Sequence, residues 1–212
     1  YSIDCLSPLE QIVERCLEIG INCIAVADHN TIAGALKLKE IAPFKVIVAE
    51  EVLTPVGEIM GLFLSVEVPK GLSPQETISQ IRSQGGLVAI PHPFGRSLPW
   101  NANMLTSTEV LSQVDIIETF NSRTPFPNSI ARAWKLAKEL GKAASAGSDA
   151  HTLGEIGHAY VEMPDFDGPD DFLNSLAQGK IFGQKSSYLA HFASTWAKIK
   201  KRILANPSPC SK

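Results

Sequence analysis

Short apolar runs alternate with amphipathic stretches along most of this chain. The apolar runs predict strands over residues 22–27, 46–49, 59–64, 87–90, 115–120 and 143–146, and residues 159–163 are also strand-like. The amphipathic stretches predict helices over residues 7–19, 31–41, 73–84, 128–140, 169–178 and 189–204. Strands that alternate with helices indicate parallel βαβ units, so we expect an α/β fold, built as an open sheet or a barrel.

Two of the expected helices begin with the same signal. Ser7-Pro8-Leu9-Glu10 and Ser73-Pro74-Gln75-Glu76 both have the S-x-x-E form of a capping box, with proline at the first helical position. Gly20 follows the first of these helices, and Gly85-Gly86 follows the second. The pattern therefore predicts a serine N-cap for each helix.

Composition limits the class of protein. With 212 residues, 44% of them hydrophobic, the chain can bury one good core, so we expect one domain over residues 1–205 and a disordered tail over 206–212. A net charge of −3 gives no general attraction to nucleic acid. Four scattered cysteines fit reduced thiols in a cytoplasmic protein, and no apolar run reaches the roughly 18 residues of a membrane span.

Side chains that bind metals follow four of the predicted strands. They are Asp28-His29, Glu50-Glu51, His92, and Asp149 with His151. In parallel α/β folds, the loops after the carboxyl ends of the strands meet on one face. Three of the five histidines in the chain occupy such positions. Each residue taken alone also fits a turn or a helix N-cap, but together they indicate one shared site.

A metal centre is the physical reason to gather these groups. Without a cation, the carboxylates would repel one another and would carry a large desolvation cost. A mixed set of imidazoles and carboxylates suits zinc, manganese or iron. The remaining histidines, His158 beside the strand-like run and His191 in the last predicted helix, fit surface or structural positions.

Several of these stretches resemble the PHP family, named for its polymerase and histidinol phosphatase members. The matching stretches are Tyr1-Ser2-Ile3-Asp4, residues 25–31 with the D-H-N-T motif, Glu50-Glu51-Val52, Ile90-Pro91-His92-Pro93, residues 117–123, and residues 147–152 with the G-S-D-A-H motif. They follow the family's order over almost the whole chain. The closest likeness is to the small stand-alone phosphoesterases of the family.

The resemblance implies a distorted (β/α)7 barrel of the PHP type that holds two or three divalent metal ions. In the family, an H-x-H-T motif ends the first strand a few residues before the position of Tyr1, and both of its histidines bind metal. The sequence contains neither of them, so the expected barrel has a truncated first strand. Met60 stands where many relatives carry a histidine, and Asn121 stands where some do.

The resemblance also assigns roles. It implies a ligand set of Asp4, His29, Glu51, His92, Asp149 and His151. It favours Glu51 over Glu50, and strand geometry agrees, because only one of two adjacent side chains points inward. Asp28 is expected to orient a ligand.

Further residues are expected around the substrate. His158 is a candidate proton donor to the leaving group. Arg96 and Arg123 are expected to bind phosphate, and Asn121 to contact a metal or the substrate. As alternatives, these arginines are solvated surface charges and Asn121 is a turn residue. The basic run 198–202 in the last predicted helix fits a solvated face, or a guide for RNA.

These expectations point to a metal-dependent phosphoesterase of small phosphorylated substrates, with nucleotides or short RNA ends favoured. Three alternatives stay open: a histidinol-phosphate type of phosphatase, another barrel metal hydrolase of the amidohydrolase kind, and a non-catalytic metal-binding accessory domain. We expect no membrane partner. The sequence does not indicate an oligomeric state.

Overall fold

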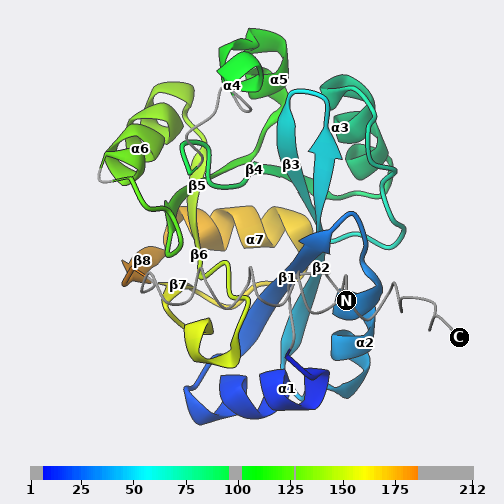
Figure 1. Ribbon diagram of the computed structural model, residues 1–212, viewed down its shortest axis with the longest axis vertical. Helices are drawn as coiled ribbons and strands as arrows, with labels where there is room; N and C mark the ends of the chain where they lie inside the picture. The colour runs from blue at the N-terminus through cyan, green and yellow to red at the C-terminus, as the bar shows by residue number, and fades with distance from the viewer. Residues whose placement is uncertain (1–6, 96–101, 127, 186–212) are drawn as a thin grey trace, which may run out of the picture.

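The computed structural model describes residues 7–95, 102–126 and 128–185 (Figure 1). The helices are α1 Leu9–Glu18, α2 Ala33–Ile41, α3 Pro74–Ser83, α4 Ala102–Thr106, α5 Thr108–Gln113, α6 Ser129–Leu140, α7 Gly168–Ala177 and the short 3-10 helix η2 Leu153–Glu155. The strands are β1 Cys23–His29, β2 Lys45–Thr54, β3 Gly57–Leu62, β4 Leu87–Ile90, β5 Ile116–Asn121, β6 Ala143–Gly147, β7 Ala159–Glu162 and β8 Lys180–Gly183. The predicted helix 189–204, with His191 and the basic run, and the predicted tail 206–212 lie outside the described residues.

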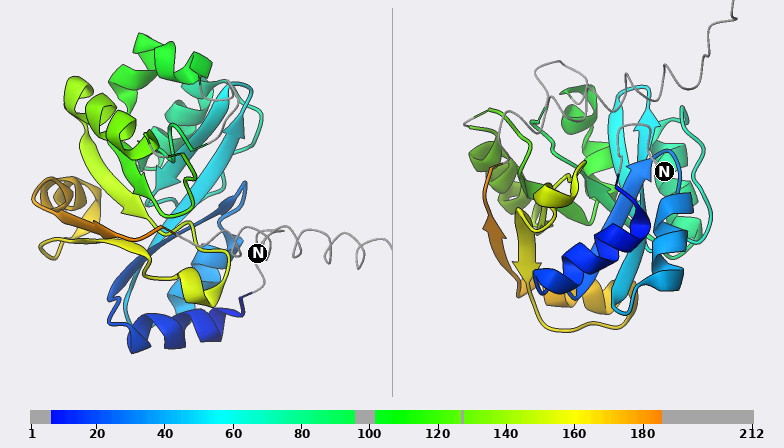
Figure 2. Two further views of the ribbon diagram at one scale, coloured as in Figure 1. Left: turned by 60° about the vertical axis from the view of Figure 1, so that its left-hand side comes forward. Right: turned by 60° about the horizontal axis from the view of Figure 1, so that its bottom comes forward.

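Six strands form one curled sheet in the order β1-β2-β3-β4-β5-β6, and β7 pairs with β8 in a separate antiparallel ribbon (Figures 1 and 2). The pairs β1/β2, β4/β5 and β5/β6 are parallel. The expected α/β class is therefore confirmed as a curled sheet that is rich in parallel strands. The full count of a seven-stranded barrel stays a prediction.

The expectation of parallel pairing is wrong at β3, which runs antiparallel to both β2 and β4. Only Pro55 and Val56 separate β2 from β3, and so short a connection can join antiparallel strands only. The turn is closed by the Thr54 hydroxyl, which donates to the carbonyl of Gly57 over 2.7 Å. A hairpin thus replaces a helical crossover at this point in the sheet.

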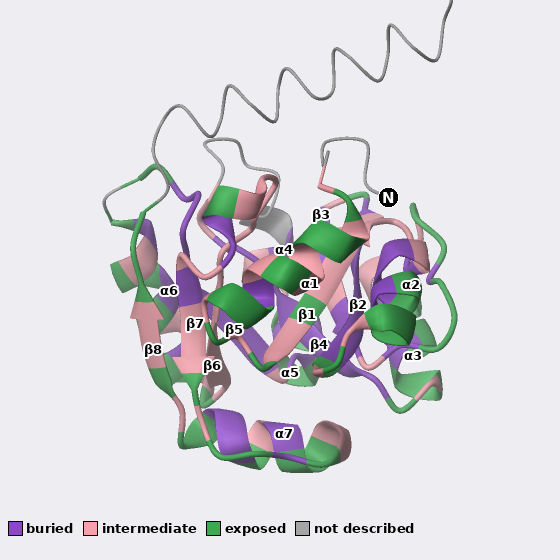
Figure 3. Ribbon diagram, turned by 90° about the horizontal axis from the view of Figure 1, so that it is seen from below, coloured by how far each residue is buried: buried purple, intermediate pink, exposed green. Residues whose placement is uncertain are grey.

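Alternation along β2 divides the core into two parts. Val48 and Val52 pack outward among residues of the covering helices, including Ile78 and Ile81 of α3. Ile47 and Ala49 face the concave side, where they cluster with Phe172 and Leu176 of α7. In Figure 3, α7 lies below the strands. Its partners on the sheet include Leu87 and Ile116, which begin their strands. Within the described residues, α7 therefore closes the amino end of the curled sheet and the other end is open.

The two predicted capping boxes have different outcomes. At α3 the box is confirmed, because Ser73 accepts a hydrogen bond from the backbone of Glu76 and the Glu76 carboxylate accepts one from the backbone of Ser73. At α1 the expected cap is wrong by one residue, because the helix begins at Leu9 and Pro8 occupies the N-cap position.

Four short elements were not expected from the sequence: α4, α5, η2 and β8. Each has only three to six residues, which is too short for a clear hydrophobic period. Within the described ranges, every helix falls short of the length and apolar character that crossing a membrane requires.

Candidate metal centre

The open end of the curled sheet gathers most of the expected ligands. His29 is the last residue of β1, His92 follows β4, and Asp149 and His151 follow β6. Glu51 lies inside β2, which runs on to Thr54 and does not end at the glutamates as expected. Asp4 and Arg96, two further expected site residues, lie outside the described residues.

His29 and Glu51 form the first pair of the site. They are direct neighbours across the β1/β2 pairing, and His29 Nδ1 lies 3.1 Å from Glu51 Oε2. The turn after β1 is fastened to β2 by Asn30, whose backbone has a left-handed φ of 56°. Its amide donates to the carbonyl of Glu51 and its side chain accepts from the amide of Leu53. The D-H-N motif therefore fixes where His29 stands.

His92 meets the same carboxylate from the other side. Its Nε2 lies 3.2 Å from Glu51 Oε1, and both side chains are about nine-tenths buried. Burial alone would lower the pKa of His92, but the hydrogen bond to Glu51 and the charges of Glu51, Glu118 and Asp149 outweigh it and raise the pKa to about 10. In the absence of a cation, His92 therefore carries a proton at neutral pH.

Glu58 of β3 is a site residue that the sequence reasoning missed. Its Oε1 lies 3.9 Å from His29 Nδ1 and its Oε2 lies 3.8 Å from His92 Nε2. Met60, the residue noted in this strand, pairs with Glu51, and Glu58 lies two positions earlier on the same face. The period of two along β3, once its pairing with β2 is known, is the signal that finds it.

These side chains fit a divalent cation. His29, Glu51 and Glu58 each offer a ligand atom, and the three atoms lie within 4.8 Å of one another. Glu51 and Glu58 are both buried, so a cation between them would offset a repulsion that burial makes strong. Imidazole and carboxylate together suit zinc, manganese or iron.

Asp149 and His151 lie at the adjacent end of β6. Asp149 has a left-handed φ of 50°, and its Oδ1 lies 3.5 Å from His151 Nδ1. Burial raises the pKa of Asp149, and the charge of Glu51 raises it further, while His92 lowers it. Asp149 therefore shares an electrostatic environment with the Glu51 and His92 pair.

Asn121 and Glu118 join these groups from β5. Asn121 Nδ2 donates to Glu118 Oε2 over 3.1 Å and to Asp149 Oδ2 over 3.4 Å, and its Oδ1 accepts from the amide of Arg123. Both ends of the Asn121 amide are engaged within the protein, and its expected contact with a metal or the substrate stays a prediction. Glu118 was not expected at the site, and burial raises its pKa to about 7 against the opposing effect of His92.

Arg123, which was expected to bind phosphate, is buried, so the alternative of a solvated surface charge is wrong. Its guanidinium donates to both carboxylate oxygens of Glu155, at 3.0 and 3.3 Å, and both side chains are buried. Glu155 also accepts from the backbone amides of His151 and Thr152. This geometry favours a role for Arg123 in holding the loop that carries His151.

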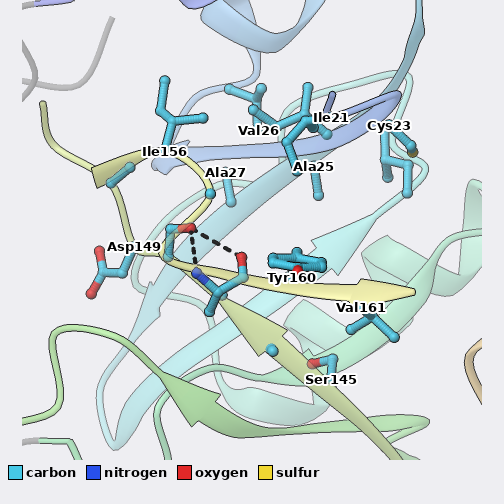
Figure 4. Close-up of a pocket in the computed structure, with 18 of the residues that line it drawn as sticks. Ile21, Cys23, Ala25, Val26, Ala27, Ser145, Asp149, Ile156, Tyr160 and Val161 are labelled. Carbon is cyan, nitrogen blue, oxygen red and sulfur yellow. Dashed lines mark hydrogen bonds between the residues drawn. The ribbon is translucent and has the colours of Figure 1, made fainter. Parts of the chain in front are cut away.

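A cavity of about 910 Å³ extends from the candidate ligands, among them His29, Glu51 and Asp149, into the concave side of the sheet. Figure 4 shows lining side chains from β1, β6 and β7, with Asp149 at one end and the apolar Ala25 and Val161 among the others. Asp28 and His158 also line this cavity. The backbone of His158 is held by the carbonyl of Glu155 and the amide of Gln184, but its expected catalytic role, like that of Asp28, stays a prediction.

Comparisons with known proteins bear on this arrangement. A family model described as PHP-associated matches residues 127–181. Uncharacterized protein MJ0417 of Methanocaldococcus jannaschii is 36% identical over 182 residues, which are 81% of this chain and 73% of that protein.

Two solved structures share the fold. A two-domain protein from Bacteroides vulgatus, containing a predicted PHP-like metal-dependent phosphoesterase, superposes with a TM-score of 0.65 at 13% identity, over 85% of this chain and 61% of its own. PsfC from Pseudomonas syringae superposes with a TM-score of 0.60 at 16% identity, over 92% of this chain and 89% of its own. At such low identities the likeness establishes a common architecture.

Proposed function

This chain belongs to the PHP family, and from that premise we propose that it is a metal-dependent phosphoesterase. One observation carries the proposal: the buried Glu51 carboxylate lies within 3.2 Å of ring nitrogens of both His29, at the end of β1, and His92, in the turn after β4. The same site gathers further carboxylates, Glu58 and Asp149, beside Glu51, and their mutual repulsion is costly without a cation. The architecture proposed with it is the complete (β/α)7 barrel of the family.

The proposed ligands are those at the open end of the sheet. His29, Glu51, His92 and Glu58 would hold one divalent ion, and Asp149 and His151 would contribute to a second, with zinc, manganese and iron as the candidates. When bound, such ions neutralise the charge of a phosphate ester and lower the pKa of an attacking water. Asp4 is proposed as a further ligand on the family resemblance alone.

The other side chains of the site would position the metal ligands, bind the phosphate and protonate the leaving group. Asn121 holds Asp149 through its amide, and Glu155 together with Arg123 fixes the backbone of His151. His158 lines the cavity beside these groups and is the proposed proton donor to the departing alkoxide. Arg96 is the proposed cationic contact for the phosphate.

Nucleotides or short RNA ends are the proposed substrates within this class. Their support is the likeness of the D-H-N-T and G-S-D-A-H motifs to the small stand-alone phosphoesterases of the family. The test is phosphate release by the full chain, loaded in turn with Mn²⁺, Zn²⁺ and Fe²⁺, from a generic aryl phosphate, a nucleoside bisphosphate, a short 5′-phosphorylated RNA and histidinol phosphate. Hydrolysis of cyclic amides in place of every phosphate ester would reassign the protein to amidohydrolase chemistry. Metal binding without turnover of any of them would make it an accessory domain.

A further inference from the structure

Glu118 lies at the junction of three strands that carry site residues. It belongs to β5 and is only 9% exposed. Its Oε2 accepts the backbone amide of His92, after β4, over 2.6 Å, and the side-chain amide of Asn121, on its own strand, over 3.1 Å. One carboxylate oxygen therefore ties together two residues of the candidate metal centre.

The bond to His92 acts on a residue whose backbone conformation is uncommon. His92 has a φ of 27°, which lies in the region that side chains other than glycine rarely adopt. Its carbonyl is engaged by the amide of Gly95, which closes the turn, and its amide is held by Glu118. The hydrogen bond at this amide stabilises the turn that directs the imidazole towards Glu51.

The third strand is β6, where the Glu118 carboxylate lies against Gly147. A Cβ added at Gly147 would overlap Glu118 Oε1 and would lie 3.3 Å from its Cδ. The φ of Gly147 is outside the left-handed region, so the backbone itself would accept alanine. Gly147, two residues before Asp149, thus leaves room for the Glu118 carboxylate, and any Cβ at this position would force that carboxylate to move.

We propose that Glu118 is a positioning residue of the metal centre, which holds His92 directly, and Asp149 through Asn121, in their ligating arrangement. The inference rests on the proposed metal-dependent function. Glu118 contacts the backbone of His92 and the side chain of Asn121, which in turn donates to Asp149. Residues that orient ligands in this way typically contribute about 10- to 100-fold to metal affinity.

The first test compares Glu118→Ala with Glu118→Gln in the full chain, with Mn²⁺ affinity measured by titration calorimetry. Glu118→Ala removes both hydrogen bonds and should weaken Mn²⁺ binding about 10- to 100-fold. Glu118→Gln can place its amide oxygen where Oε2 lies, accept both bonds, and stay within about threefold of wild type. Unchanged affinity in Glu118→Ala would overturn the proposal. An equal loss in Glu118→Gln would also overturn it, because it would make Glu118 a ligand.

The second test displaces the Glu118 carboxylate by a substitution at its neighbour Gly147 and leaves Glu118 itself unchanged. Gly147→Ala should displace the carboxylate, because Oε1 and Oε2 move as one rigid group, and should weaken Mn²⁺ binding as Glu118→Ala does. Adding Gly147→Ala to Glu118→Ala should then cause no further loss, because the overlapping atom is gone. Additive losses would contradict the proposal. Gly154→Ala is the matched control, since a Cβ there meets no atom within 4 Å.

Failure of this inference is distinguishable from failure of the proposed function. Thermal unfolding of each variant identifies loss of fold, and if Glu118→Ala does not fold, the Gln variant and Gly147→Ala carry the test. If the wild-type protein binds Mn²⁺ but releases no phosphate, the proposed phosphoesterase function is wrong. The Mn²⁺ affinities of the Glu118 and Gly147 variants then still decide the role of Glu118. A wild-type protein that binds no divalent metal contradicts both.

Discussion

Two adjacent glutamates of β2 lie in opposite surroundings. Glu51 faces the concave side and lies within 3.2 Å of ring nitrogens of His29 and His92. Glu50 is fully buried on the outer side, where it accepts the amide of Val68 over 2.9 Å, and burial raises its pKa. The strand's period of two separates a carboxylate that faces the site from one that faces the core.

The pair offers a matched substitution. Altering a residue that orients a ligand typically lowers metal affinity about 10- to 100-fold. Glu51→Gln should lower Mn²⁺ affinity by at least that much, because it removes a negatively charged ligand. Glu50→Gln keeps an oxygen to accept from Val68 and should leave Mn²⁺ affinity unchanged. Titration calorimetry on the two variants checks this, and a larger loss in Glu50→Gln would contradict the assignment of Glu51.

Proton release on metal binding should report on His92. Its pKa of about 10 means that the metal-free side chain is protonated below that pH, whereas a ligating imidazole must be neutral. Metal binding at pH 7 should therefore release a proton from His92, and affinity should rise with pH towards 10. Calorimetry in buffers of different ionisation enthalpy counts the protons. His92→Gln should release about one proton fewer than wild type when metal binds. An equal number of protons released would show that His92 is not a ligand.

At the scale of elements, the two S-P-x-E sequences allow a comparison of helix caps. Ser73→Ala should lower the free energy of unfolding by about 1 kcal/mol, because Ser73 caps α3. Ser7→Ala should cost less than half of that, since α1 begins at Leu9 with Pro8 as its N-cap. Urea unfolding of both variants decides the matter, and equal losses would show that Ser7 also acts as a cap.

Much of the element pattern followed from periodicity, because strands such as Leu87–Ile90 are apolar and are bounded by glycine and proline. The antiparallel β3 did not follow, because strand direction depends on the length of the Thr54–Gly57 turn, which apolar runs do not encode. Glu58 was missed for the same reason. Its place at the site depends on pairing between β2 and β3, and that pairing is a tertiary property.

At the scale of the whole molecule, residues far apart in the sequence meet because parallel strands bring their carboxyl ends to one edge. His29 and His92 could be predicted to converge from this rule, and the structure places both beside Glu51. The Arg123 and Glu155 pair could not be predicted, since neither residue ends a strand and only the fold buries them together.

A bound cation should stabilise the folded chain as a whole. A ligand at 100 times its dissociation constant adds about 2.7 kcal/mol to the free energy of unfolding, so Mn²⁺ at that excess should raise the Tm by roughly 5–10 °C for a chain of this size. Differential scanning fluorimetry with Mn²⁺ and then with excess chelator measures the shift. Glu51→Gln should show little of it, and an equal shift in that variant would mean that the metal binds elsewhere.

The metal content of the purified full chain, measured together with its phosphate release, tests most directly whether this protein is a metal-dependent phosphoesterase. We expect at least one equivalent of zinc, manganese or iron per chain, and phosphate-ester hydrolysis that chelation abolishes and added metal restores. Glu51→Gln should lose both the metal and the activity. Metal-free protein that hydrolyses phosphate esters in excess chelator, or Glu51→Gln protein that keeps full metal content, would contradict this function.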